Sequence, residues 1–491
     1  LHYQLPPYGQ AKLVRAIEGR VLDVAVDIRK SSSTFGKHVA IELTSQNKHQ
    51  LFIPQGFAHG FVTLSRSAKF AYKVDNYYSP KHDRGIAYND KDLSINWKLP
   101  EEDLKLSDKK VILDSIKIKN KYLSKNLKFN IIEEQSHKFI SKNLILKDAS
   151  INSKTIKKND IFFAIQGKKV DGNNFVTEAF KKKASLSVVN RLNKKYPFSK
   201  QIKVSNSLNF LTNCSKIYRK NLDTKIIAIT GSCGKTTLKE MIGSTLKEFS
   251  KTSYSPKSYN NRYGVPLSLF NLRQNDDFGV LEVGMDKKGE IDLLTKIILP
   301  DIGIITNISY AHSKNFKNIN GIASAKAEII KNIRQNGTLI LNGDDQFFNF
   351  HKKIALKKKL KILSFGIKKK PLSTRLIKIK KINDRFKFLI KIENNLYNFY
   401  SKNNNKSNIY NILATLTVLN IFKDLTKISK NIFLNFKSPK GRGDISKIKI
   451  NKKNIVLVDE TYNSNPLSLR TAIENFDKIE KENCKKYIIL G

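Results

Sequence analysis

The first hundred residues show the alternation of apolar and polar positions that β-strands produce. Between residues 22 and 28, Leu, Val and Ile alternate with Asp23, Ala25 and Asp27, which is the period-2 pattern of a half-buried strand. Further short apolar runs follow at 39–43, 50–53, 60–64 and 69–74, separated by Gly, Pro, Ser or Asn. Many short strands at such spacing predict a β-sandwich or barrel.

From about residue 223 the pattern changes to strands that alternate with helices. It predicts strands over 226–230, 279–283, 301–308 and 338–341, and helices over 235–248 and 322–333. This alternation predicts a parallel, doubly wound sheet. Residues 352–400 are so rich in Lys and Asn that the pattern assigns no elements there.

The length of the chain predicts the number of domains, and its charge bears on whether it binds nucleic acid. A chain of 491 residues predicts three or four domains. Residues 1–100 hold 14 basic and 8 acidic residues, so the surplus of +48 lies almost entirely in the later segments. It is mostly lysine and spread out, which favours solvated faces over a nucleic-acid surface. A non-enzymatic, basic nucleic-acid-binding protein remains the alternative of another class.

Membrane and export signals are not found in the sequence. No run of 18 apolar residues occurs, which excludes a conventional transmembrane helix, and the first residues do not resemble a signal peptide. Three cysteines, Cys214, Cys233 and Cys484, are too few for a disulfide framework or a zinc site. These features predict a cytoplasmic protein. Because the chain starts with Leu1 and stops at Gly491 directly after an apolar run, we expect both ends to be cut.

A glycine-containing loop at 230–237, with the sequence TGSCGKTT, follows an apolar strand and opens a helix. Glycines let backbone N–H groups close on phosphate oxygens, and the helix N-terminus favours negative charge. Lys235 would reach the β- and γ-phosphates, and the Thr236 hydroxyl would ligate Mg²⁺. Ile229 stands where the common spacing has its first glycine, but the strand–loop–helix context favours a nucleotide site over a chance turn.

Two further polar residues follow predicted strands. Glu282 ends one strand and His312 comes after the next. Because parallel strands end at one edge of the sheet, both could hold Mg²⁺ beside the loop. Taken alone, Glu282 is more often a surface carboxylate and His312 more often a helix-cap or loop histidine; their shared position after parallel strands makes the functional interpretation about as strong as the structural one.

Several motifs together resemble the Mur ligases. They lie at 231–237, 258–266, 282–291, 306–312, 325–329, 341–345 and 459–466. The last one, with the Asn-Asn-x-x-Gly-x-Pro box at 260–266, resembles the UDP-N-acetylmuramoyl-tripeptide–D-alanyl-D-alanine ligases. Upstream, 153–154, 160–167 and 171–172 resemble their UDP-binding first domain.

This resemblance implies a multidomain α/β ligase over 127–491. It implies a UDP-substrate domain at 127–222, a central ATP-binding domain at 223–435 with a doubly wound P-loop sheet, and an incomplete, Rossmann-like C-terminal domain at 436–491. The implied reaction is ATP-dependent amide formation, in which a tripeptide acyl phosphate is attacked by the amine of D-alanyl-D-alanine.

The same resemblance implies roles for individual residues. ATP is implied to contact Gly231, Ser232, Gly234, Lys235, Thr236, Thr237, Asn411 and Arg442. Thr236, Glu282 and His312 are implied to hold Mg²⁺, and Lys326 matches a catalytic position that is carbamylated in some relatives. Ser153 and Asn261 are implied to contact the substrate.

The amino-terminal segment carries a different set of polar residues. His2, Lys12, His59 and Tyr72 lie in or beside short β runs. Such groups inside a small barrel could act on a proton α to a carbonyl, although His and Tyr in barrels are more often core or rim residues.

The amino-terminal sequence resembles the dTDP-4-dehydrorhamnose 3,5-epimerases, which have a cupin-like β jelly roll. The matching segments are 1–4, 12–15, 21–30, 34–36, 50–64 and 72–80. The resemblance implies an incomplete epimerase domain at 1–110, followed by a junction at 111–126, and a possible homodimer acting on a dTDP-4-keto-6-deoxy-sugar. His2 matches the catalytic base, Tyr72 the acid and Lys12 a substrate-side lysine. Asp23 and His59 match pocket positions, and Asp108 is the nearest match to the aspartate that orients His2.

The sequence therefore predicts an ATP-dependent ligase fused to an epimerase-like domain. Only the epimerase activity, or an inactive fragment or artificial join of two genes, are the alternatives that the sequence leaves open.

Overall fold

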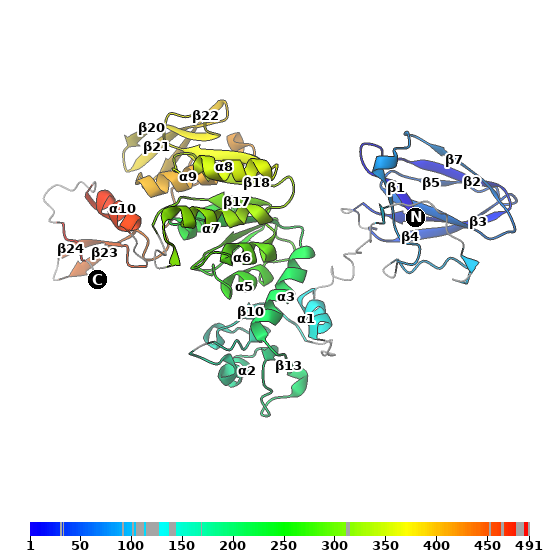
Figure 1. Cartoon of the computed structure of the whole chain (residues 1–491), viewed down its shortest axis with the longest axis horizontal. Helices are drawn as coiled ribbons and strands as arrows, with labels where there is room; N and C mark the ends of the chain where they lie inside the picture. Colours follow the sequence, from blue (N-terminus) through cyan, green and yellow to red (C-terminus); the bar gives the residue numbers. More distant parts are fainter. Residues whose placement is uncertain are drawn as a thin grey trace. The chain divides into compact units, whose positions relative to one another are not determined.

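The computed structural model describes residues 1–489 except 30–31, 33, 91–92, 101–102, 105–111, 114–126, 137–143, 168, 311–314, 451–452, 463–465 and 478–485. The chain divides into two compact units, Leu1–Leu127 and Lys128–Gly491, each drawn in Figure 1. The domain boundaries predicted within the second unit stay predictions. In the described part of the chain, no helix has both the length and the hydropathy that a membrane crossing needs.

The amino-terminal unit is built from two β-sheets. One has the strand order β4-β3-β6-β1-β8-β9 and the other the order β5-β2-β7. Neighbouring strands are antiparallel, except that β8 and β9 are parallel. The strands are β1 (His2–Gln4), β2 (Lys12–Glu18), β3 (Arg20–Asp27), β4 (His38–Thr44), β5 (Leu51–Ile53), β6 (Phe57–Thr63), β7 (Lys69–Val74), β8 (Asp83–Gly85) and β9 (Ile112–Leu113).

Strand β3 is buried on both faces, so the prediction of a half-buried strand was wrong. Leu22, Val24 and Val26 pack into a cluster that includes Leu93, while Val21 and Ala25 pack into a second cluster with residues of β2. The acidic residues of the alternating pattern, Asp23 and Asp27, are buried, and their carboxylates have hydrogen-bond partners. Asp27, for example, accepts hydrogen bonds from Arg29, Ser32 and Thr34.

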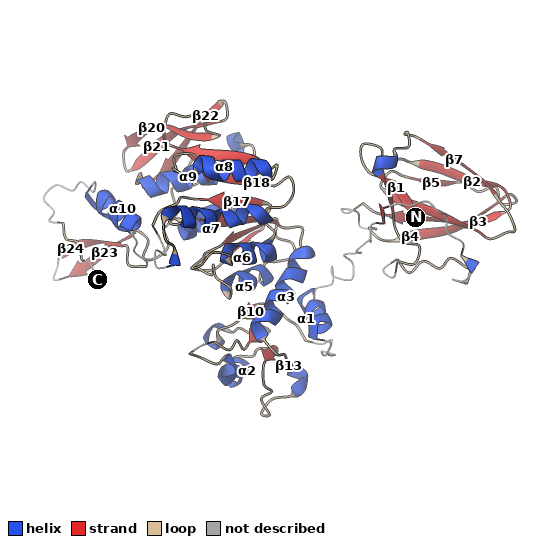
Figure 2. Ribbon diagram, in the orientation of Figure 1, coloured by secondary structure: helices blue, strands red, loops and turns tan. Residues whose placement is uncertain are grey.

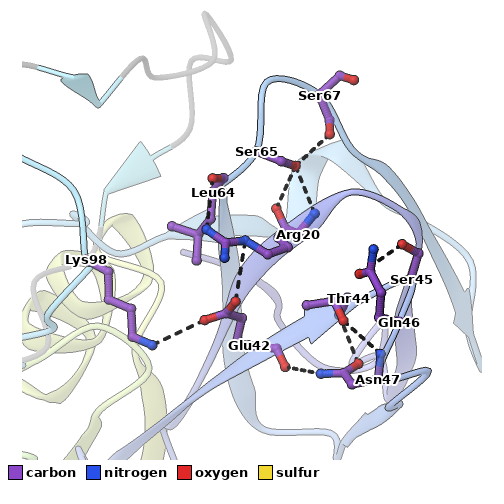
Figure 3. Close-up of polar contacts among 10 residues, drawn as sticks. All are labelled: Arg20, Glu42, Thr44, Ser45, Gln46, Asn47, Leu64, Ser65, Ser67 and Lys98. Carbon is purple, nitrogen blue, oxygen red and sulfur yellow. Dashed lines mark hydrogen bonds and ion pairs between the residues drawn. The ribbon is translucent and has the colours of Figure 1, made fainter.

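A polar network fixes the end of this sheet where β3 begins (Figure 3). The Glu42 carboxylate lies 3.6 Å from Nε of Arg20 and 3.4 Å from Nζ of Lys98. The backbone N–H of Arg20 donates to Oγ of Ser65 at 2.8 Å, and Nδ2 of Asn47 donates to the Glu42 carbonyl at 3.0 Å. Exposed ion pairs contribute about 0–1 kcal/mol each, so we assign the positioning to the backbone hydrogen bonds.

The second unit begins with a small α/β layer. Its parallel sheet has the order β10-β11-β12-β13. The elements are α1 (Leu127–Ser136), β10 (Ala149–Ser150), β11 (Ile161–Phe163), α2 (Val176–Lys181), β12 (Leu186–Val189), β13 (Gln201–Lys203) and α3 (Ser207–Lys220).

A nine-stranded sheet with the order β15-β16-β14-β17-β18-β19-β20-β21-β22 follows, and Figure 2 shows helices against it. All neighbours from β15 to β20 are parallel, and β20 to β22 are antiparallel. Its elements are β14 (Lys225–Thr230), α4 (Lys235–Lys247), β15 (Thr252–Tyr254), α5 (Gly264–Phe270), β16 (Phe278–Glu282), α6 (Glu290–Ile298), β17 (Ile302–Ile305), α7 (Ile319–Asn332), β18 (Thr338–Asn342), α8 (Phe348–Lys357), β19 (Lys361–Gly366), β20 (Thr374–Ile382), β21 (Arg385–Ile392), β22 (Asn395–Ser401) and α9 (Lys406–Phe422). A hairpin of β23 (Asp444–Ile450) and β24 (Lys453–Asp459) precedes α10 (Pro466–Asp477).

The strand order reverses at β14, which lies between β16 and β17. In such sheets the carboxyl ends of the strands at the reversal open a crevice that binds ligands. The strand predicted over 301–308 ends at Ile305, which corrects that prediction. The reason is local: the N–H groups of Ile308 and Ser309 donate to the side chains of Asp345 and Ser232 instead of to a neighbouring strand.

Arg219 of α3 ties this helix to the nine-stranded sheet and is fully buried. Its guanidinium donates to the carbonyls of Ile298 and Leu299 at 2.7 and 2.9 Å and to the Asp301 carboxylate at 2.9 Å. Removing a buried cation leaves the buried acceptors without donors, which costs more than the net worth of the pair.

We therefore predict that Arg219→Met lowers the free energy of unfolding of the second unit by about 3–5 kcal/mol. Urea unfolding followed by far-UV circular dichroism measures this. Fluorescence of Trp97, the single tryptophan of the chain and a residue of the first unit, is the internal reference. The matched control is Arg191→Met, because Arg191 pairs with Asp171 at the exposed surface and should cost under about 1 kcal/mol. Equal effects of the two substitutions would contradict this account.

Candidate functional sites

The crevice at the carboxyl ends of β14, β16 and β17 has a volume of about 1030 Å³. Its walls include the loop residues 232–234, Ser258 with 260–263, the segment 306–308, and the first turns of α9. Four separate stretches of sequence therefore meet at the point where the sheet reverses its strand order.

The loop between β14 and α4 is held tightly by the segment that follows β17. The N–H of Ser232 donates to the Asn307 carbonyl at 2.9 Å, and the N–H of Cys233 donates to Oδ1 of Asn307 at 3.0 Å. Oγ1 of Thr306 donates to the Cys233 carbonyl at 2.7 Å. Gly231 has φ +143°, and a Cβ atom there would collide with Oγ1 of Thr306. Only glycine fits this close approach.

Lys235 places its charge inside the loop. Its Nζ donates to the carbonyls of Gly231 and Ser232 at 2.8 and 3.2 Å. Burial lowers the pKa of Lys235, and the Glu282 carboxylate partly offsets this. Backbone N–H groups at a helix start, together with a buried ammonium group, form a site for an anion.

Glu282, at the end of β16, is the buried carboxylate of the crevice. It accepts hydrogen bonds from Oγ1 of Thr236 and from Nδ2 of Asn260, each at 2.7 Å. The structure thus brings together Thr236 and Glu282, two of the residues predicted as Mg²⁺ ligands. Asn260 was not among the predicted site residues, although its place beside Asn261 in the Asn-Asn box was the available signal.

Lys326 of α7 is 1% exposed, and its Nζ has no hydrogen-bond partner in the described part of the chain. Burial, and next the charge of Lys235, hold the pKa of Lys326 well below its usual value. A buried amine costs free energy unless it is paired or neutral. Its environment therefore favours the neutral, nucleophilic form of the amine.

The amino-terminal unit has its own polar cluster between the sheets. Nε2 of His59 lies 3.0 Å from both carboxylate oxygens of Asp23, and both side chains are buried. His2 is the β1 partner of His59 in the sheet. Tyr72 lies on the same face of β7 as Phe70, whose ring stacks on His59 with centroids 6.4 Å apart. Four of the predicted residues therefore share one region.

Lys12 and Tyr72 lie on neighbouring strands, since Lys12 pairs with Val74 and Tyr72 with Val14. The carboxylate of Asp83, which the sequence analysis did not select, lies 3.9 Å from Nδ1 of His2. Asp83 also accepts hydrogen bonds from Gln4 and Tyr78. Asp108 lies outside the described residues.

Comparison with known proteins gives two separate matches along the chain. The profile for dTDP-4-dehydrorhamnose 3,5-epimerase matches residues 1–117, and that for the Mur ligase middle domain matches residues 229–419. The UDP-N-acetylmuramoyl-tripeptide–D-alanyl-D-alanine ligase of Rickettsia prowazekii is 31% identical over 355 residues, which cover 72% of this chain and 77% of the relative. The chain belongs to the Mur ligase family.

A solved structure, the MurF ligase from Thermotoga maritima in complex with ADP, has a TM-score of 0.58 at 26% identity and covers 69% of this chain and 76% of that one. The dTDP-4-dehydrorhamnose 3,5-epimerase of Shigella flexneri is 57% identical over 111 residues, or 23% of this chain and 60% of that relative. Both predicted resemblances are confirmed, as is the multidomain order of an epimerase-like domain followed by α/β Mur ligase domains.

The remaining residues predicted for the Mur ligase part fall into three groups. Thr237, Asn411 and Arg442 line the crevice, and Arg442 donates to Oγ of Ser258 at 3.2 Å. Asn261 also lines it, but its Oδ1 accepts from the N–H of Gly264 at 3.0 Å and so fixes the start of α5. Ser153 lies in the small α/β layer, where it donates to Glu178 at 2.7 Å. His312 lies outside the described residues.

Proposed function

We propose that residues 127–491 act as an ATP-dependent ligase that joins D-alanyl-D-alanine to a UDP-N-acetylmuramoyl-tripeptide. The observation that carries this proposal is that Lys235, Thr236 and Glu282 lie together at the crevice where the strand order of the sheet reverses. The activity of the Rickettsia relative, a UDP-N-acetylmuramoyl-tripeptide–D-alanyl-D-alanine ligase, and the ADP in the Thermotoga structure support it.

In this proposal the loop at 231–237 is a P-loop that holds the phosphates of ATP. The loop N–H groups and Lys235 stabilise the charge that develops as a tripeptide carboxylate oxygen attacks the γ-phosphorus and ADP leaves. The amine of D-alanyl-D-alanine then attacks the acyl carbon, and inorganic phosphate leaves. Asn411 and Arg442 would contact ATP, whereas Ser153 and Asn261 would contact the UDP-linked substrate.

The hydroxyl of Thr236 and the carboxylate of Glu282 also fit Mg²⁺, because they are oxygen donors 2.7 Å apart at a phosphate loop. Bound there, Mg²⁺ would neutralise phosphate charge, and His312 is the proposed third protein ligand. Asn260 would hold the carboxylate of Glu282 in the orientation seen here.

We propose that Lys326 carries a carbamate. A neutral amine attacks CO₂ and releases a proton, which leaves a carboxylate on Nζ. The support is that this buried amine, whose pKa is lowered, has no hydrogen-bond partner among the residues that the structure describes. A carboxylate in that place would be a further oxygen ligand for Mg²⁺.

The amino-terminal unit is proposed to be a dTDP-4-dehydrorhamnose 3,5-epimerase domain, of which the chain spans 60% of the Shigella relative. His2 would remove the proton next to the keto group, Lys12 would stabilise the enolate, and Tyr72 would return a proton. The buried pair of His59 and Asp23 would form the wall of the pocket. A homodimer and a cytoplasmic location complete the proposal.

The ligase proposal predicts that the full chain releases inorganic phosphate from ATP only when both the UDP-linked tripeptide and D-alanyl-D-alanine are present. Lys235→Ala should lower the rate about 1000-fold or more, since it removes the cation that faces the transferred phosphoryl group. Lys251→Ala is the matched control, because Lys251 is exposed at the end of the same strand–helix unit. Similar rates in the two variants would contradict the assignment.

For the epimerase proposal we expect the chain to catalyse exchange of solvent deuterium into C3 and C5 of dTDP-4-keto-6-deoxy-glucose, followed by NMR. His2→Asn should slow this exchange by about 100- to 10,000-fold, the usual contribution of a general base. His49→Asn should have no effect, because His49 is exposed in a loop. Exchange that survives His2→Asn would remove His2 from the base role.

A further inference from the structure

The three antiparallel strands at the end of the nine-stranded sheet carry an unusual outward face. Strand register places six cations on it, with Arg375 opposite Lys391, Lys380 opposite Lys387, and Lys378 and Arg385 on the same side. The other face alternates with it and is buried: Phe388, Ile390, Ile392 and Phe399 pack into the main core with residues of α9. These six cations therefore gather on the solvent side, whereas the register places Lys381, opposite Phe386, on the inward face.

No ion pair forms with any of these six cations among the described residues. The nearest acids along the chain, Asp384 and Glu393, lie in the two turns and not on the face itself. Two of the direct cross-strand pairs join like charges, an arrangement that destabilises a sheet. An anionic partner would offset this repulsion.

Apolar groups lie between the cations. Leu396 is 60% exposed, and Ile377, at the bulge of β20, is 42% exposed. Leu389 lies opposite Lys378. The ring of Tyr400, opposite Lys387, is covered by the guanidinium of Arg385 at 4.4 Å from its centroid.

We propose that the outward face of β20–β22 is a docking surface for an anionic lipid bilayer. Cations beside Leu389 and the exposed Leu396 suit the boundary between headgroups and acyl chains, where charge and apolar area both contribute. A nucleic-acid backbone would satisfy the cations but would leave the exposed Leu396 in water. It also favours stacking on free aromatic rings, whereas Tyr400 is already covered. The protein would lie on the membrane and would not cross it, in keeping with the hydropathy of its described helices.

The test is co-sedimentation of the full chain with vesicles of phosphatidylcholine containing about 30% phosphatidylglycerol, at about 0.1 M salt, where the screening length is about 10 Å. We expect binding that phosphatidylcholine alone does not support. The triple variant Lys378→Gln, Lys380→Gln, Lys387→Gln should lower the affinity for these vesicles by about 100-fold, because each cation near the surface contributes a factor of about five. The matched control removes Lys194, Lys195 and Lys200, three exposed lysines of the small α/β layer, by the same substitution.

A second variant separates lipid from nucleic acid. Leu396→Ser should weaken vesicle binding at least about threefold and leave binding of a mixed-sequence DNA duplex unchanged. Equal losses in the two triple variants would assign the affinity to overall charge and overturn the proposal. Absence of vesicle binding would also overturn the proposal. The same holds if the chain binds the duplex through residues 378–387 and does not bind vesicles.

Discussion

The close approach between Gly231 and Thr306 is the constraint on which the ligase site depends. Because no side chain fits at Gly231, the loop after β14 can lie against the segment after β17 and exchange hydrogen bonds with Thr306 and Asn307. That contact keeps the loop N–H groups and Lys235 at the start of α4. It also sets the distance from the loop to Glu282, the buried carboxylate on the other side of β14.

The sequence was sufficient to predict the fold where its pattern was strong. The strands at β14, β16 and β18 and the helices α4 and α7 lie where the alternation predicted them, to within a few residues. It was not sufficient for β20–β22, because Lys and Asn fill the outward positions of strands whose inward positions are apolar. The burial of β3 was also predicted wrongly, because Asp23 and Asp27 have the spacing of solvent-facing residues, and only their partners in the structure explain why they are buried.

The candidate site residues also differ in how far the sequence could predict them. Residues within one motif, such as Lys235 and Thr236, could be selected because their spacing along the chain fixes their geometry. Asp83 could not, since its role depends on a contact with a residue 81 positions away in sequence. For Asn260, which contacts a residue 22 positions away, the place beside Asn261 in the Asn-Asn box was the available signal. The distribution of charge behaves likewise: lysines that are spread along the sequence gather on one face only when the strands pair.

The most direct measurement is calorimetric titration of Mg²⁺-ATP into the full chain and into two matched glycine variants. Gly231→Ala and Gly289→Ala each add one methyl group at a positive φ, but only the first meets an atom of the protein within 4 Å. The account predicts saturable binding by the wild type, its loss in Gly231→Ala, and its retention in Gly289→Ala. Binding that survives in Gly231→Ala would contradict the claim that this contact builds the nucleotide site.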